Sequence, residues 1–274
     1  MNNLVNDINE RKVEEAFTAQ SLKFDMLYGD DSMIAYKRTR VRQHISSYLQ
    51  PGSEMLELNC GTGEDAFYFA RLGFKVHATD LSQGMLDELM QKKSAQPGFN
   101  AITVEQCSFT KLEQLKNKGP FDYVYSNFGG LNCTDDLNTV LADLTPLIKP
   151  EGYLTLVIIS KFCLWESLLI FKGKFRTAFR RFFSGGGRQA RAEGKNFKCW
   201  YYHPSFVVNA LKSQFTTVFL EGLCAIVPPS YIEGFAKNHP FAFDYLCRQE
   251  NKRKSAYPWK FIGDYFIITL QRRN

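Results

Sequence analysis

The sequence predicts a doubly wound α/β fold, in which helices cover both faces of a mainly parallel sheet. Three neighbouring segments support this prediction. Met55–Asn59 is a short apolar run with the length of a buried strand. After a glycine loop, Asp65–Leu72 carries apolar residues at helical spacing. Lys75–Thr79 then forms a second strand, so the chain alternates strand, helix and strand, as parallel sheets require.

Glycines and an acid stand where these two strands end. Gly61 and Gly63 follow the first strand, and Asp80 ends the second. Glycine lets a ligand approach the backbone because it has no Cβ, and such sheets bind ligands at the carboxyl ends of their strands. A carboxylate at the second tip can accept both hydroxyls of a ribose. We therefore expect a nucleotide site, with a helix-capping turn and a solvated Asp80 as the simpler alternative.

Two cofactor classes fit the loop. The pattern G-x-G-x-x-A from Gly61 satisfies the dinucleotide fingerprint that an NAD(P)-dependent oxidoreductase would use. However, Glu64 and Asp65 open the following helix, where two carboxylates suit the helix dipole but repel a pyrophosphate. A cationic ligand without a phosphate fits the loop better.

The stretch resembles the first motif of the class I S-adenosylmethionine-dependent methyltransferases, E/D-x-x-x-G-x-G, which Glu57, Gly61 and Gly63 satisfy. Asp80 matches the acid that closes the family's second strand. The resemblance covers residues 40–160 well and is closest to the small-molecule, quinone-biosynthesis-like members. It implies a Rossmann-like sheet of seven strands with the last strand antiparallel. It also implies S-adenosyl-L-methionine as cofactor and S-adenosyl-L-homocysteine as product.

The resemblance further implies which residues hold the cofactor. The methionine portion would lie on the glycine loop, the ribose on Asp80, and the adenine near the third strand's tip. There the chain has Cys107-Ser108-Phe109 where many members carry an aspartate. Tyr28 is the candidate from the N-terminal helices, unless its ring only packs them onto the sheet. The full expected set is Tyr28, Glu57, Asn59, Gly61, Gly63, Asp80, Leu81, Ser108, Phe109 and Asn127.

The remaining elements follow from periodicity and turn residues. Helices are expected at residues 13–27, 34–49, 83–93, 136–147, 206–211 and 239–246. Further strands are expected at residues 101–106, 121–127, 153–159, 216–224 and 264–271. The expected parts are an N-terminal helical cap (1–50), the cofactor-binding core (51–160), a lid insertion after the fifth strand (161–203) and the C-terminal part of the core with acceptor-pocket elements (204–274).

The insertion is basic and aromatic. Nine lysines and arginines lie between Phe171 and Cys199, opposed only by Glu193, and Gly185–Gly187 supplies a flexible hinge. We expect a mobile lid over the acceptor pocket. Its charge allows contact with an anionic or membrane-resident substrate, or marks a solvated helix face. Nucleic-acid binding is not expected, since no recognised module accompanies the charge.

Candidate acceptor residues are Phe128, at the tip of the fourth strand, and the more distant Tyr202 and Tyr231. His203 is the candidate general base because histidine titrates near neutrality; a helix-entry histidine bonded to backbone is the alternative. The chain lacks the Asn/Asp-Pro-Pro-aromatic motif of enzymes that methylate base amines or glutamine, and no clustered carboxylates suggest a metal. We expect O-methylation of a small-molecule or lipid-like acceptor.

Composition is consistent with a cytoplasmic enzyme. The 274 residues are 45% hydrophobic, with a net charge of +6. Seven cysteines without a C-x-x-C pair argue against a disulfide framework or a zinc site. The polar N-terminus predicts no signal peptide. A SAM-binding regulatory protein without transfer activity stays open, because binding and catalysis share these motifs, and so does the oligomeric state.

Overall fold

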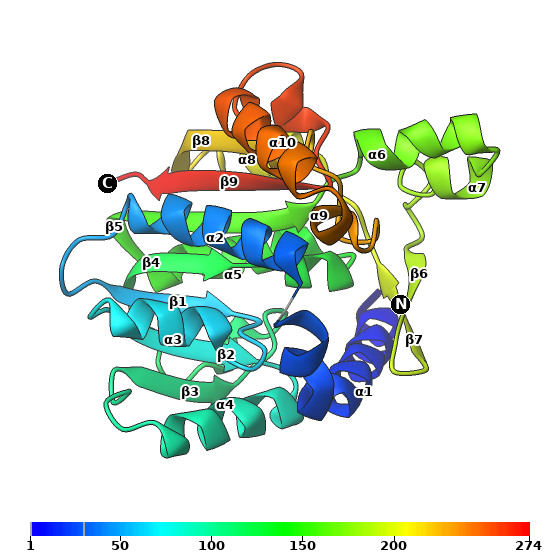
Figure 1. The fold of residues 1–274 in the computed structure, drawn as a ribbon. Coiled ribbons are helices and arrows are strands. Elements are labelled where there is room, and N and C mark those ends of the chain that lie inside the picture. The colour runs from blue at the N-terminus through cyan, green and yellow to red at the C-terminus, as the bar shows by residue number, and fades with distance from the viewer. Residues whose placement is uncertain (1, 30) are drawn as a thin grey trace.

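The structure is a computed structural model that describes residues 2–29 and 31–274. Its main sheet has seven strands in the order β3-β2-β1-β4-β5-β9-β8 (Figure 1). The first five run parallel, and β9 is antiparallel to both of its neighbours. The predicted seven-stranded sheet with an antiparallel last strand is thus confirmed. The strands are β1 (Glu54–Leu58), β2 (Lys75–Asp80), β3 (Ile102–Gln106), β4 (Phe121–Ser126), β5 (Ile148–Ile159), β8 (Phe215–Leu223) and β9 (Tyr265–Arg272).

Helices cover both faces of this sheet because successive strand residues point to opposite sides. In β1, Met55 packs in the core cluster with one set of helices, and Leu56 and Leu58 pack in the cluster on the other face. The first set is α2 (Ser32–Ser46), α3 (Glu64–Arg71) and α4 (Gln83–Ala95). The second is α5 (Leu137–Leu144) and α8 (Pro204–Leu211).

Most predicted elements are present with shifted ends. The fifth strand begins at Ile148 rather than Tyr153, because Ile148 already pairs with Phe121 before a register shift. The predicted helix 136–147 is α5 followed by a 3-10 turn. The 3-10 turns among the described residues are η1 (Leu112–Gln114), η2 (Gly130–Cys133), η3 (Thr145–Leu147), η4 (Leu168–Lys172) and η5 (Trp259–Phe261).

The N-terminal helix α1 (Asn2–Tyr28) lies at the carboxyl edge of the parallel strands, on the right in Figure 1. It contacts α4 and the hairpin of β6 (Arg188–Ala192) and β7 (Lys195–Cys199). Asn9 fixes it there, because its side-chain amide donates to the carbonyl of Cys133 at 2.8 Å and its oxygen accepts from the Lys198 amide at 2.7 Å. The helix therefore closes the edge where ligands bind.

The insertion also contains two short helices, α6 (Leu164–Ser167) and α7 (Phe175–Ala178), which project away from the sheet in Figure 1. Part of its basic charge is internal. Arg181, only 3% exposed, donates to Glu166 at 2.6 Å and to Asp264 at 2.5 Å. Glu166 and Asp264 both lie outside the stretch from Phe171 to Cys199 that carries the nine basic residues. The composition of that stretch alone therefore overestimated its unpaired positive charge.

A second buried charge cluster joins α2 to strand β8 and to helix α10 (Pro240–Arg253), which follows the short helix α9 (Phe235–Asn238). Arg40 on α2 donates to Glu221 at 2.8 Å, and Tyr36 donates to Glu250 at 3.0 Å. Both carboxylates are fully buried. Removing one partner of such a cluster would leave an uncompensated buried charge, so the cluster holds α2 in place.

Candidate active site

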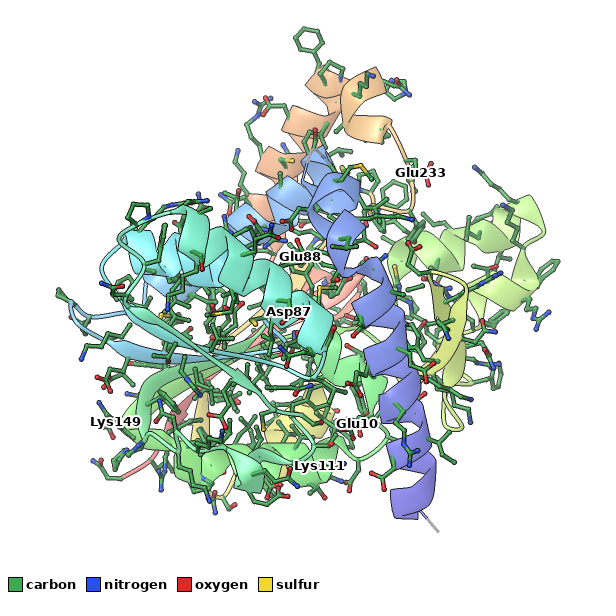
Figure 2. The ribbon with its side chains drawn as sticks, turned by 90° about the horizontal axis from the view of Figure 1, so that it is seen from below. Glu10, Asp87, Glu88, Lys111, Lys149 and Glu233 are labelled. Carbon is green, nitrogen blue, oxygen red and sulfur yellow. The ribbon has the colours of Figure 1, made fainter. Side chains whose placement is uncertain are left out.

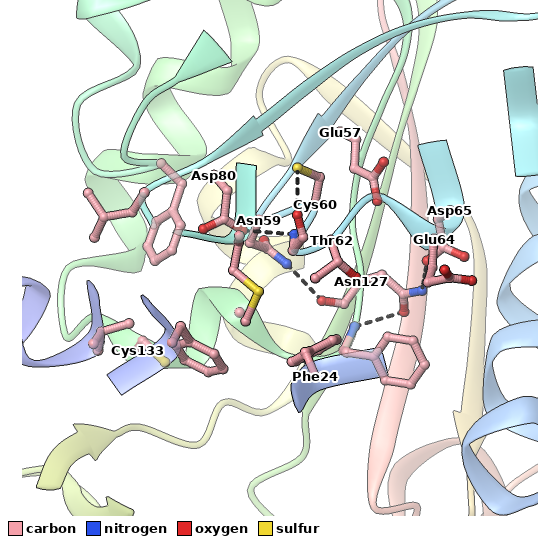
Figure 3. Close-up of a pocket in the computed structure, with 18 of the residues that line it drawn as sticks. Phe24, Glu57, Asn59, Cys60, Thr62, Glu64, Asp65, Asp80, Asn127 and Cys133 are labelled. Carbon is pink, nitrogen blue, oxygen red and sulfur yellow. Dashed lines mark hydrogen bonds between the residues drawn. The ribbon is translucent and has the colours of Figure 1, made fainter. Parts of the chain in front are cut away.

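A cavity of about 320 Å³ lies between the carboxyl ends of the central strands and helix α1 (Figure 3). This is where parallel α/β sheets bind ligands. Nine of the ten residues expected to bind the cofactor line this cavity. The tenth, Gly63, does not line it, although its neighbours Thr62 and Glu64 do. Gly63 opens α3, and a Cβ there would lie 2.6 Å from the Leu89 side chain, so this glycine is required for the packing of α3 on α4.

Two carboxylates, Glu57 and Asp80, flank the glycine loop in Figure 3. Glu57 is 2% exposed, and among the described residues its Oε2 has no hydrogen-bond partner. Burial, and then the charge of Asp65, raise the pKa of Glu57 well above its ordinary value. Asp80 accepts from the amides of Gly61 at 2.9 Å and Ser82 at 2.8 Å. Burial raises the pKa of Asp80, and these amide bonds oppose that rise.

The loop leaves space for a ligand at Gly61. Its φ is 55°, and a Cβ there would point toward the Phe24 ring at 4.0 Å, across the cavity. Asn59 has φ 48° and is held by the tip of β4: it accepts from Ser126 Oγ at 2.6 Å and donates to the Asn127 carbonyl at 2.9 Å. The tips of β1 and β4 are thus fixed to one another before any ligand binds.

The acids that open α3 are neutralised by partners that the sequence did not indicate. Asp65 is 4% exposed, accepts from Arg42 at 2.6 Å and Asn127 at 2.7 Å, and lies 3.4 Å from Arg38. Glu64 lies 3.2 Å from the Lys92 ammonium. The repulsion expected between these two acids and a pyrophosphate is therefore weaker than the sequence suggested.

At the other side of the loop, Leu81, Ser108 and Phe109 line the cavity. Ser108 Oγ lies 2.8 Å from Thr110 Oγ1, which donates to Glu10 on α1 at 2.8 Å. Glu10 lies beside the segment after β3 in Figure 2. This chain of hydrogen bonds fastens α1 to the tip of β3.

The roof of the cavity is one face of α1. Val13, Phe17, Phe24 and Tyr28 line the cavity from this helix. Tyr28 accepts from Gln20 at 3.2 Å, and its ring lies 4.8 Å from that of Phe24. The apolar spacing of α1 was the available signal for this roof.

The polar contacts of Asp25, near the C-terminal end of α1, were not predicted from the sequence. Asp25 accepts from Thr62 Oγ1 of the glycine loop at 2.6 Å and from the Lys92 ammonium at 2.7 Å. It ties α1 directly to the loop. A helix residue and a loop residue 37 positions apart form no local pattern, so no sequence signal was available.

The far wall of the cavity lies beyond the tip of β4. Phe128, with φ 51°, stands under the side chains of Arg38 and Lys37, whose charged groups lie 4.9 and 5.6 Å from its ring centroid. Ser230 and Tyr265 complete this wall. Of these residues, only Phe128 was predicted.

The structure does not bring Tyr202, His203 and Tyr231 to the cavity. Tyr202 is buried and donates to the Thr134 carbonyl at 2.5 Å. His203 caps α8, where its Nδ1 accepts from the Ser205 amide at 3.2 Å; burial, and then Lys161, lower the pKa of His203. Tyr231 is 44% exposed.

The insertion does not form the expected lid. No residue of 161–203 lines the cavity. Instead its hairpin braces α1: the rings of Phe17 and Phe197 lie 5.9 Å apart, and Lys195 lies 3.2 Å from Glu15. Helix α1 is the roof, and the insertion supports it from outside.

In residues 2–29 and 31–274, no group of three or more histidine, cysteine or acidic side chains is arranged to hold a metal ion. None of the helices in this part of the chain combines the length and apolar character needed to cross a bilayer.

Comparisons with known proteins agree with this geometry. Residues 55–152 match the family described as Methyltransferase domain. A demethylmenaquinone methyltransferase of Bacillus cereus strain B4264 is 31% identical over 146 residues, which are 52% of this chain and 60% of the relative. Residues 55–152 form a methyltransferase domain. The chain thus matches less than two thirds of the length of this curated relative.

Solved structures show the same fold. A SAM-dependent methyltransferase of Methanosarcina mazei aligns over 84% of this chain and 97% of its own, with 18% identity and a TM-score of 0.57. The 1,6-didemethyltoxoflavin-N1-methyltransferase of Burkholderia thailandensis aligns over 96% of this chain and 88% of its own, with 15% identity and a TM-score of 0.56. At these identities the likeness concerns the Rossmann-like architecture of the methyltransferase domain.

Proposed function

We propose that this protein transfers a methyl group from S-adenosyl-L-methionine to a hydroxyl of an apolar small-molecule or lipid-like acceptor. One observation carries the proposal: Glu57 and Asp80 place two carboxylates on either side of a glycine loop in one cavity. Such an arrangement suits a ligand with a positively charged end and a ribose.

The residues present fit this cofactor. The orphaned Oε2 of Glu57 can accept from the methionine amino group, which would compensate its burial. Asp80 can accept from the ribose, while Leu81, Ser108 and Phe109 hold the adenine. Tyr28 would close the methionine end from α1. The Burkholderia thailandensis structure, whose fold is related, was determined with S-adenosylhomocysteine bound.

Bound S-adenosylmethionine supplies a methyl group already activated by its sulfonium. The protein's contribution is to align the acceptor with that group and to exclude water. The apolar face of α1 serves the second purpose, because Val13, Phe17 and Phe24 cover the cavity. Asn127 and Phe128 would stand between the two ligands.

The nature of the acceptor is supported by the lining and by the relatives. Phe17, Ile34 and Phe128 give the cavity an apolar wall, and Ser230 and Tyr265 add hydroxyls that can hold an acceptor oxygen. The Bacillus cereus relative and the Burkholderia thailandensis enzyme are named for the small molecules demethylmenaquinone and 1,6-didemethyltoxoflavin.

The same proposal includes transient contact with an anionic bilayer through the α6–α7 segment. Phe171, Phe175 and Phe183 are 86%, 58% and 71% exposed there, and Lys172 and Lys174 are exposed beside them. Apolar side chains flanked by cations favour anionic lipid surfaces. Sedimentation with phosphatidylglycerol vesicles should exceed that with phosphatidylcholine vesicles, and F171S/F175S should lose the difference. Equal sedimentation with both would refute this contact.

The transfer itself is tested with methyl-labelled S-adenosylmethionine and a panel of apolar phenols and alcohols, followed by mass spectrometry. We expect label in an ether product and equimolar S-adenosylhomocysteine. Tight cofactor binding without product over the whole panel would favour a regulatory protein instead. Reduction of NAD⁺ in the presence of any alcohol of the panel would favour the oxidoreductase.

A further inference from the structure

The far wall of the cavity contains a buried cation without a matching acid. Lys37, on α2, is 3% exposed, and its ammonium donates to Ser230 Oγ at 3.1 Å. The rings of Tyr265 and Phe128 lie 5.0 and 5.6 Å away. Among the described residues, no carboxylate lies within 4.0 Å of this ammonium, although the other fully buried cations, Arg40 and Arg181, have one. An unpaired buried charge is costly unless a ligand compensates it.

The surroundings of Lys37 favour its charged form. Burial lowers the pKa of Lys37, but the interactions with Tyr265, Cys224 and the two nearby aspartates outweigh burial and raise that pKa above its ordinary value. The titratable and charged groups around it are Tyr265, Cys224, Asp264, Asp31 and Arg38. Asp264 is already bound to Arg181, and Asp31 caps α2, so neither is free to pair with the lysine.

The sheet topology places Lys37 on the side of the cavity where an acceptor would bind. Tyr265 begins the antiparallel β9 and pairs with Ile159 at the end of β5. It therefore lies at the same edge as the carboxyl ends of the parallel strands. In the strand order, β9 lies two places beyond β4 on the side away from β2, which ends in Asp80. Phe128, directly after β4, stands between the two ends.

We propose that Lys37, with Ser230 and Tyr265, binds the ionised hydroxyl of a phenol-type acceptor. This inference rests on the proposed function and names its acceptor class. An aromatic ring suits a wall made by Phe128, Tyr265 and Ile34. The ammonium stabilises the phenolate, so the acceptor binds without its hydroxyl proton, which leaves to water.

The transfer step then balances without a protein base. A lone pair of the phenolate oxygen forms the new O–C bond while the S–C bond breaks, and that bond's electron pair stays on sulfur. An anion and a sulfonium cation become a neutral ether and a neutral thioether. No histidine is required at the cavity, in agreement with the position of His203 outside it.

A spectroscopic titration tests this assignment without turnover. The probe is 4-nitrophenol, whose phenolate and phenol absorb at different wavelengths, added to protein saturated with S-adenosylhomocysteine. We expect the pKa of the bound probe to fall by about one unit or more, a tenfold preference for the phenolate. Lys37→Met should abolish the shift, and Lys37→Arg should retain most of it. Lys212→Met, an exposed lysine after α8, should behave as wild type.

The controls separate the failure modes. Lys37→Met must still bind S-adenosylhomocysteine and melt cooperatively, which shows that it is folded. If wild-type protein fails to bind S-adenosylhomocysteine, the proposed function fails, whatever the probe does. If S-adenosylhomocysteine binds but the probe's pKa is unchanged, or is lowered equally in Lys37→Met, the acceptor assignment is wrong. Tighter binding of benzoate than of 4-nitrophenolate would also overturn it, in favour of a carboxylate acceptor.

Discussion

The two ends of the cavity differ in the sign of their charge and in how the chain builds them. At the cofactor end, Glu57 and Asp80 come from two adjacent strand tips within one short stretch. At the acceptor end, Lys37, Ser230 and Tyr265 come from a helix, a loop and a strand far apart in the sequence. A negative end and a positive end suit a cationic methyl donor and an anionic acceptor. The difference therefore orders the two ligands along one cavity.

The largest expected effect is at the negative end. Asp80→Ala removes the proposed ribose contact and also the acceptor of the Gly61 and Ser82 amides. We expect S-adenosylhomocysteine to bind about tenfold or more weakly, since a hydrogen bond to a charged group contributes about 1.5–3 kcal/mol. Asp87→Ala, an exposed acid of α4, serves as the matched control in calorimetry. If both variants bound S-adenosylhomocysteine with equal affinity, Asp80 would not be part of the cofactor site.

This contrast also explains what could be predicted from the sequence. Strand, loop and helix signals are local, so the order of elements around Glu57 and Asp80 could be predicted, and so could the position of both carboxylates at one cavity. Lys37 gave no signal, because only the fold brings it to Ser230 and Tyr265.

The insertion shows the same limit. Its basic composition predicted a charged lid, but composition does not identify distant partners. Arg181 is neutralised by Glu166 and Asp264, and the hairpin packs against α1 through Phe197. His203 was the best-placed base by chemistry alone, and its backbone contact at the start of α8 was the alternative that the geometry favours.

The second-largest effect is expected at Glu57, where a substitution should change ligand affinity and stability in opposite directions. Its folded-state pKa lies well above the ordinary 4.5, so stability is fully present below that value and is lost as pH rises through the folded pKa. Glu57→Gln should therefore raise the melting temperature of the ligand-free protein at neutral pH, by about 2–4 °C for each kcal/mol gained. It should also weaken S-adenosylhomocysteine binding. Thermal melts against pH, with and without ligand, measure both. A variant less stable at every pH would contradict the account.

A smaller effect is expected at the positive end. Ser230→Ala removes the hydroxyl that accepts from Lys37 but leaves the charge. The Lys37 charge still holds the phenolate and water can replace the lost hydroxyl, so 4-nitrophenolate should bind a few-fold more weakly while S-adenosylhomocysteine binding is unchanged. Tyr231→Phe, next in the chain but outside the cavity, is the control. A parallel loss of S-adenosylhomocysteine affinity would show that the two ends are not independent.

The smallest effect is expected outside both ends. His203→Ala removes the cap of α8 and should lower stability by about 1 kcal/mol, whereas His203→Asn should restore it. Neither should change the rate of methyl transfer or its pH profile. A large drop in the rate of methyl transfer for both variants, with stability intact in the asparagine variant, would show that His203 acts in catalysis.

The most direct test of the central claim is calorimetric titration of the wild-type protein with S-adenosylhomocysteine and, separately, with NADH. The arrangement of Glu57, the glycine loop and Asp80 predicts one S-adenosylhomocysteine per chain with micromolar affinity, and no saturable binding of NADH. The titration repeated in buffers of different ionisation enthalpy should show proton release, because Glu57 must ionise to hold the amino group. Saturable binding of NADH would contradict the account, and so would the absence of binding by both ligands.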